Sequence, residues 1–180
     1  LHDALPICKR LKESKGKMAC NILIVTNRPA IANSWYDDFV KFLGTESGFR
    51  FVSEVSALKG KPYVLTRYEY TDNLSSSGLA SCIEFVSLQD LKGSLYFGGQ
   101  YDKLKELVQM QWELLVIDEA HEGVDTSKTD VAFHQIKRNH TLHLSGTPFK
   151  ALANDKFPAD AIYNWTYADE QKAKRDWSEI

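Results

Sequence analysis

Cysteine is scarce in this sequence, with three residues, Cys8, Cys20 and Cys82, among 180. Their number is odd and they form no C-x-x-C pair, which argues against a disulfide framework and a cysteine zinc site. We therefore expect a reducing, cytoplasmic setting. No apolar run approaches the roughly 20 residues that a membrane-crossing helix needs. The N-terminus also lacks the continuous apolar stretch of a secretory signal, so no membrane partner is predicted.

An excess of charge of either sign is also missing. Lys and Arg number 22 and Asp and Glu number 24, which gives a net charge of −2. This balance neither demands nor excludes nucleic acid, and a binding face would have to be a local basic patch. The length and a hydrophobic fraction of 43% suit a globular domain with a substantial core.

Short apolar runs alternate along the chain with segments of helical spacing. The runs predict strands at 20–26, 49–55, 63–65, 82–87, 112–117, 141–145 and 161–167, and helices are expected near 3–13, 31–43, 104–108 and 126–136. Residues 72–78 have loop composition, and Leu5, Ile7, Cys8 and Leu11 would form the apolar face of the first helix. Several strands are apolar throughout, which predicts an α/β fold with a parallel sheet flanked by helices.

Polar side chains stand where the predicted strands end. They are Thr26, Asn27, Ser87, Asp118, Glu119 and Ser145. In parallel sheets ligands bind beyond the carboxyl ends of the strands, so these residues are expected along one edge. Asp118 and Glu119 directly follow the aliphatic run 114–117, where two adjacent carboxylates require a metal, a ligand or water. Asp118 suits Mg²⁺, Glu119 could face a water that attacks a phosphate, and His121 could hydrogen-bond across the site.

Four segments carry a resemblance to superfamily 2 helicases and translocases. VIDEAH (116–121) resembles their Walker B or DEAH-box motif, and HLSGTPFK (143–150) resembles motif III. LIVTNRPAIANSWYDDF (23–39) resembles motif Ia, and VSLQDL (86–91) resembles region Ib. The wording is most similar to motor subunits of type III restriction enzymes, and the resemblance extends over roughly residues 8 to 170.

The resemblance implies the first RecA-like domain of a motor with ATP and Mg²⁺ as cofactors. Asp118 would hold Mg²⁺ through water, Glu119 would activate the hydrolytic water, and His121 would couple ATP to nucleic acid. Ser145 and Thr147 would be the motif III hydroxyls at the nucleotide. Nucleic acid, DNA rather than RNA, would be contacted by Thr26, Asn27, Arg28, Ser87 and Gln89. Further implied partners are a second RecA-like domain and a nuclease or methylase subunit.

The chain departs from the family pattern at the phosphate loop, G-x-x-x-x-G-K-[ST]. The KGK at 15–17 lacks the first glycine and the hydroxyl, and Gly60-Lys61 is followed by Pro62. The N–H cradle and the phosphate lysine are therefore missing. We expect a piece of a longer motor protein that is inactive by itself, with a truncated helix and basic turn at 1–17 and a partial RecA-like domain at 18–180.

Other interpretations remain open beside the motor. A non-catalytic RecA-like module that binds nucleic acid or protein would also fit the missing loop. A zinc site could be built from His121, His134, His140 and His143, although His140 and His143 would point to opposite faces of a strand. Asp160, Glu170 and Lys172 resemble a magnesium nuclease core, but a solvated helix face is favoured. Trp35, Phe39 and Phe42 could stack on bases, but their helical spacing favours the core. Arg28 beside Pro29 could bind a phosphate.

Overall fold

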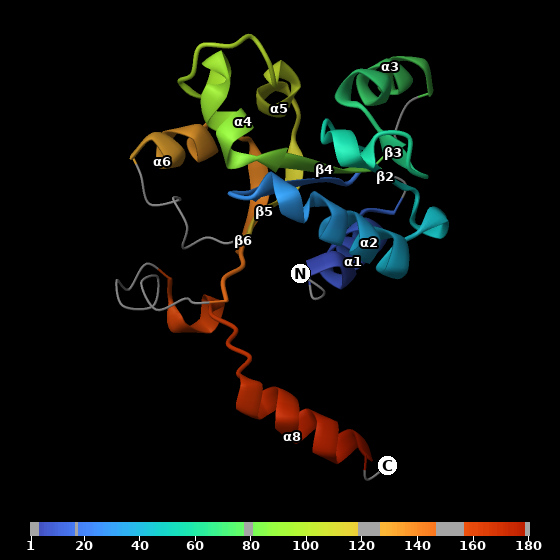
Figure 1. Ribbon diagram of the computed structural model, residues 1–180, viewed down its shortest axis with the longest axis vertical. Coiled ribbons are helices and arrows are strands. Elements are labelled where there is room, and N and C mark those ends of the chain that lie inside the picture. The colour runs from blue at the N-terminus through green and yellow to red at the C-terminus, as the bar shows by residue number, and fades with distance from the viewer. Residues whose placement is uncertain (1–3, 17, 78–80, 119–126, 147–156, 179–180) are drawn as a thin grey trace. The chain divides into compact units, whose positions relative to one another are not determined.

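The computed structural model describes residues 4–16, 18–77, 81–118, 127–146 and 157–178. The chain divides into two compact units, Leu1–Gly146 and Thr147–Ile180. The first unit holds a sheet with helices on both faces (Figure 1). The second contains helix α8 (Tyr167–Ser178) and a 3-10 turn at Ala159–Ala161. Among the described helices, none is long and apolar enough to cross a lipid bilayer.

The sheet has six strands in the order β3-β2-β4-β1-β5-β6, and all its neighbours run parallel. The strands are β1 (Asn21–Thr26), β2 (Phe49–Ser53), β3 (Val64–Leu65), β4 (Ser81–Ser87), β5 (Trp112–Asp118) and β6 (Arg138–His143). This confirms the predicted parallel α/β fold, which is RecA-like. The helices α1 (Ala4–Lys15), α2 (Ala32–Phe42), α3 (Arg67–Ser77), α4 (Leu88–Gly93), α5 (Lys105–Gln109) and α6 (Ser127–His134) flank it.

Two apolar clusters cover the two faces of the sheet. Helices α1 and α2 pack on one face, and α3 to α6 pack on the other (Figure 1). Side chains alternate between these clusters along β5, so that Leu114 and Val116 face α1 and α2 whereas Leu115 and Ile117 face the other helices. All seven residues of β5 are buried, as expected for a strand covered on both faces.

The edge strand β6 differs from the predicted strand 141–145 by beginning earlier. Arg138 pairs with Trp112 at its start, and none of its six residues is buried. An edge strand buries less of its surface than a central strand, so polar residues are tolerated at 138–140. The sequence therefore shows no apolar run at these positions. The prediction therefore found only the apolar end of this strand.

Helix α1 packs into the same core cluster as α2. Leu5 and Cys8 are buried, and Leu11 is half-buried against the cluster. Ile7 is 41% exposed, so its predicted place on the inner face is wrong. Cys8, Cys20 and Cys82 are all buried free thiols.

The predicted loop at 72–78 is wrong over residues 72–77, because helix α3 extends from Arg67 to Ser77, and Gly78 lies outside the described residues. The helix begins with a capping box. The Thr66 N–H donates to Glu69 Oε2 over 2.7 Å, and the Glu69 N–H donates to Thr66 Oγ1 over 3.2 Å. The T-x-x-E pattern was visible in the sequence and outweighs the loop composition that follows it.

The predicted strand at 161–167 is also wrong. A 3-10 turn ends at Ala161, and α8 begins at Tyr167. Thr166 and Asp169 cap this helix reciprocally, with the Thr166 N–H donating to Asp169 Oδ2 over 2.8 Å and the Asp169 N–H donating to Thr166 Oγ1 over 3.2 Å. The large apolar residues Ile162, Tyr163, Trp165, Tyr167 and Trp177 are exposed. The first four gave residues 161–167 the apolar pattern of a strand, although none of these side chains is buried.

Candidate functional site

Three strands of the sheet end side by side on oxygen-bearing residues. Thr26 pairs in register with Ser87 of β4 on one side and with Asp118 of β5 on the other. Each is the last residue of its strand, and they are only 1%, 4% and 6% exposed. The sheet therefore gathers these predicted site residues at its carboxyl edge, where ligands bind in open α/β sheets.

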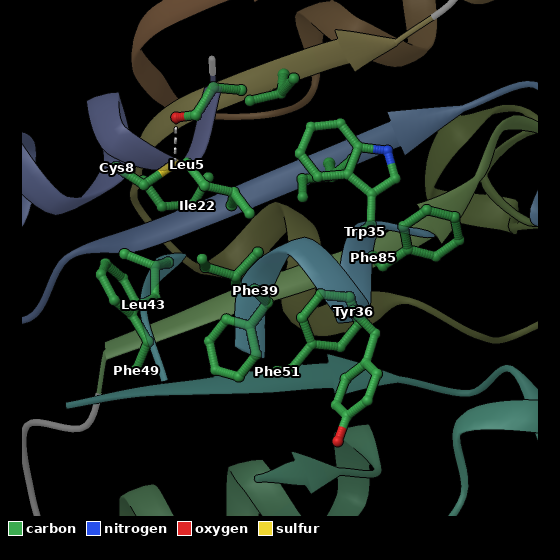
Figure 2. Close-up of a cluster of buried hydrophobic side chains, with 14 of the residues drawn as sticks. Leu5, Cys8, Ile22, Trp35, Tyr36, Phe39, Leu43, Phe49, Phe51 and Phe85 are labelled. Carbon is green, nitrogen blue, oxygen red and sulfur yellow. Dashed lines mark hydrogen bonds between the residues drawn. The ribbon is translucent and has the colours of Figure 1, made fainter. Parts of the chain in front are cut away.

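The carboxylate of Asp118 is held by a tryptophan. Residue alternation along β5 places Asp118 on the same face as Leu114 and Val116, toward helix α2. There the indole N–H of Trp35 donates to Asp118 Oδ2 over 3.0 Å. Trp35 is fully buried, and Figure 2 shows its ring in the core near Phe85. The contact joins residues that are 83 positions apart in the sequence.

The connection from β1 to α2 forms a turn at the same edge. The Arg28 N–H donates to Thr26 Oγ1 over 3.3 Å, so the buried hydroxyl of Thr26 shapes this turn. Asn27 and Arg28 are exposed beyond it. Arg28 precedes the 3-10 turn Pro29–Ile31, which leads directly into α2. Of the predicted nucleic-acid residues in this loop, Asn27 and Arg28 present the accessible surface.

The connection from β4 to α4 is a capped helix start. The Asp90 N–H donates to Ser87 Oγ over 3.0 Å, and the Ser87 hydroxyl donates to Asp90 Oδ2 over 2.8 Å. This hydroxyl is therefore engaged in capping α4. Gln89 is exposed in the first turn of the helix. Because β4 and β1 are neighbours, the β4–α4 and β1–α2 connections leave the same edge of the sheet.

Ser145 lies two residues beyond β6, next to the end of β5. The Leu144 N–H donates to the carbonyl of Ile117 over 2.9 Å and continues the pairing past His143. Ser145 is therefore at the same edge as Asp118, and it is partly buried. Glu119, His121 and Thr147 lie outside the described residues.

The donor atoms at this edge suit a hard cation. They comprise the Asp118 carboxylate with the hydroxyl of Thr26 beside it in register. Within the described residues, no three His, Cys, Asp or Glu side chains are close enough to hold a metal ion. One carboxylate with oxygen neighbours fits Mg²⁺, which keeps several waters and binds substrate phosphates rather than a cage of protein ligands.

The described histidines are spread over the fold. His140 is exposed, and its Nε2 is 3.6 Å from Glu113 Oε1 near the amino end of β5. His143 pairs with Ile117 near the other end, and His134 is exposed at the end of α6. The described part of the zinc hypothesis, His134, His140 and His143, is therefore not a cluster.

Two further interpretations are decided by burial. Trp35 and Phe39 are fully buried, which confirms the predicted core role and contradicts base stacking for these two rings. Glu170 is exposed and pairs with Lys174 over 2.7 Å on α8, as a solvated helix face would. Asp160 is also exposed.

The fully buried carboxylate of Glu84, in the middle of β4, was not predicted. It lies on the opposite face of the sheet from Asp118, in line with Cys82 and Val86. Arg67 Nε is 2.6 Å from Glu84 Oε1 and 2.5 Å from Glu106 Oε1. Burial raises the pKa of Glu84 to about 7, against the lowering effect of Arg67. An acidic residue between apolar residues of a strand was the available sequence signal.

Comparison with known proteins identifies the family. The sequence model of the type III restriction enzyme res subunit matches residues 4–150. The chain belongs to this family. It is also 24% identical, over 194 aligned positions, to a Mycoplasma pneumoniae protein named as the C-terminal part of a type II restriction enzyme and methyltransferase. The alignment covers 85% of this chain and 25% of that protein, so this res-family chain spans about a quarter of its relative's length.

Proposed function

We propose that this res-family chain is part of an ATP-dependent DNA translocase in a restriction-modification system. The observation that carries the proposal is the alignment of Thr26, Ser87 and Asp118 at the carboxyl edge of a parallel sheet. The family match, which includes the segment VIDEAH, supports a nucleotide as the ligand of this edge.

In this proposal the last residue of β5 and residues that follow it have separate roles in ATP hydrolysis. Asp118 would hold Mg²⁺ through water, and the cation when bound supplies charge neutralisation at the phosphates. Glu119 would accept a proton from the attacking water, since a carboxylate can act as a general base. His121 would couple this site to nucleic acid, and Ser145 with Thr147 would respond to the nucleotide.

We further propose that DNA lies along the two exposed connections at this edge. Asn27 and Arg28 follow β1, and Gln89 follows β4, the neighbouring strand. An arginine at this place can bind a backbone phosphate, which positions a nucleic acid without reading its sequence. A nuclease or methylase partner is in keeping with the name of the M. pneumoniae relative.

A second candidate function is a RecA-like module that binds nucleic acid without hydrolysing ATP. It is favoured by one observation, the lack of a G-x-x-x-x-G-K-[ST] segment in the sequence. Without that loop the 180-residue chain should turn over ATP more slowly than about 1 s⁻¹, an ordinary enzyme rate, with or without DNA. A phosphate-release assay checks this, and faster turnover would show that another segment replaces the loop.

The two candidates are separated by Mg²⁺-dependent nucleotide binding. The wild-type chain is titrated with a fluorescent ATP analogue at millimolar concentration, with and without Mg²⁺. We expect Asp118→Asn to weaken the Mg²⁺-dependent binding by about tenfold or more, because it removes the charge facing the cation. Asp37→Asn is the matched control, since Asp37 is an exposed aspartate of α2. If the wild type shows no Mg²⁺-dependent binding, the module interpretation replaces the motor.

DNA binding is tested with Arg28→Ala against Arg50→Ala, a second exposed arginine. We expect Arg28→Ala to weaken duplex DNA binding and to reduce its salt dependence, because one phosphate contact is lost. Arg50 lies in the first half of β2 and should have no such effect. Equal effects of both changes would contradict a specific contact by Arg28.

A further inference from the structure

A side chain that donates a hydrogen bond to Asp118 comes from a helix that follows another strand. Trp35 is the fourth residue of α2, and five residues, which include the Pro29–Ile31 turn, separate α2 from the end of β1. Its indole N–H reaches Asp118 Oδ2 over 3.0 Å. Helix α2 therefore connects the carboxylate at the end of β5 to the exposed loop that contains Asn27 and Arg28.

The surroundings of Trp35 fix the direction of its N–H. The ring is fully buried in the cluster that also contains Phe39, Phe51 and Phe85, and Figure 2 shows it beside Phe85. A buried indole requires a partner for its N–H, and a charged oxygen is a stronger acceptor than a carbonyl. A tightly packed ring has few alternative orientations, so the position of Asp118 Oδ2 is constrained in turn.

We propose that Trp35 is a positioning residue for the metal-binding carboxylate of Asp118. It fixes Oδ2 by its indole N–H while the carboxylate, which offers about four lone-pair sites, still faces the edge of the sheet. The proposal rests on the function proposed above, because Asp118 needs a fixed orientation only if it binds a cation. Groups that orient a metal ligand in this way typically contribute roughly 10- to 100-fold to metal affinity.

The chain supplies a matched control in Trp112. This residue is also fully buried, and its indole N–H donates over 3.0 Å, but to the backbone carbonyl of Leu107. Trp112 is the first residue of β5 and Asp118 is the last, so the control lies at the other end of the same strand. Trp35→Phe and Trp112→Phe each remove one buried indole N–H, but only the first removes it from Asp118.

The experiment measures Mn²⁺ binding to the 180-residue chain in the presence of ATP. Because ATP alone chelates Mn²⁺, binding to the protein is followed by the enhanced relaxation of water protons that the protein-bound Mn²⁺–ATP complex causes. We expect Asp118→Asn to abolish the binding and Trp35→Phe to weaken it about tenfold. Trp112→Phe should leave it within twofold of the wild type. A Trp35→Phe protein that is folded and binds Mn²⁺ as tightly as the wild type overturns the inference and leaves the proposed function intact.

A second measurement on the wild type does not depend on the folding of Trp35→Phe. The chain has four tryptophans, so its ¹⁵N-labelled indole N–H resonances form a short and readable set. We expect Asp118→Asn and Mg²⁺ with ATP each to shift the Trp35 resonance, and Mn²⁺ to broaden it before that of Trp112. A Trp35 resonance that Mg²⁺ leaves unmoved overturns the inference. Absence of any Asp118-dependent Mn²⁺ binding overturns the proposed function and the inference together.

Discussion

Glu84, Glu113 and Asp118 are the buried acidic residues of the described sheet. Two of them, Asp118 and Glu84, differ most clearly in place and partner. Asp118 ends β5 at the carboxyl edge and accepts a hydrogen bond from the indole of Trp35. Glu84 lies in the middle of β4 on the other face and pairs with the guanidinium of Arg67. Arg67 also contacts Glu106 of α5, and its backbone N–H donates to Glu54 Oε1 over 2.7 Å.

The difference shows that burial of an acid does not by itself mark a functional site. Glu84 is enclosed between the start of α3 and α5, where Arg67 balances charge inside the fold. Asp118 stands where the strand order and direction leave an edge for a ligand. Position in the sheet therefore separates a carboxylate that stabilises the fold from one that can serve chemistry.

The largest expected effect concerns Arg67. Arg67→Met leaves the buried Glu84 without its cation, and we expect a loss of about 3–5 kcal/mol in the free energy of unfolding at pH 8. The matched control is Lys103→Met, which breaks the exposed pair of Lys103 with Asp90 and should cost about 1 kcal/mol or less. Urea denaturation measures both. Equal costs would mean that the buried pair is worth no more than a surface pair.

The pH dependence of stability should reveal Glu84 directly. Burial raises its pKa from 4.5 to about 7, so the folded state holds this proton more tightly than the unfolded chain. The stabilising effect is complete below about pH 4.5 and is lost as the pH rises through 7. The decline due to Glu84 is on the order of 3 kcal/mol.

The variant Glu84→Gln removes this titration and should flatten the stability curve between about pH 5 and 8. Arg67 keeps Glu106 as a partner in this variant, so its charge is not left alone. Chemical denaturation at several pH values gives the slope for both proteins. A slope equal to that of the wild type would assign the pH dependence to another group.

The smallest expected effect on stability is that of Asp118→Asn. Asparagine keeps an oxygen that can accept the Trp35 N–H, so the free energy of unfolding should fall by about 1 kcal/mol or less. The same change should nevertheless weaken Mg²⁺-dependent nucleotide binding by about tenfold or more. Thermal denaturation beside nucleotide titration tests this separation. A loss of stability as large as that of Arg67→Met would place Asp118 among the structural carboxylates.

Much of the fold could be predicted from local patterns. The apolar runs at 20–26, 82–87 and 112–117 correspond to β1, β4 and β5, because a strand buried on both faces must be apolar throughout. Patterns failed where a segment is exposed, as at 161–167, or where a cap outweighs composition, as at Thr66. At 161–167 the prediction gave more weight to the apolar residues, and at 72–78 to the loop composition. In both cases the capping residues at the start of the helix were the better signal.

The sequence by itself determined the parallel sheet and the order of its motifs. It also placed Thr26, Ser87 and Asp118 at strand ends, since periodicity and chain direction are local properties. Only the tertiary structure decided that Asp118 faces Trp35 and that Glu84 is paired with Arg67. Those partners depend on which helix covers which face of the sheet, and they are joined by packing across the core rather than by spacing along the chain.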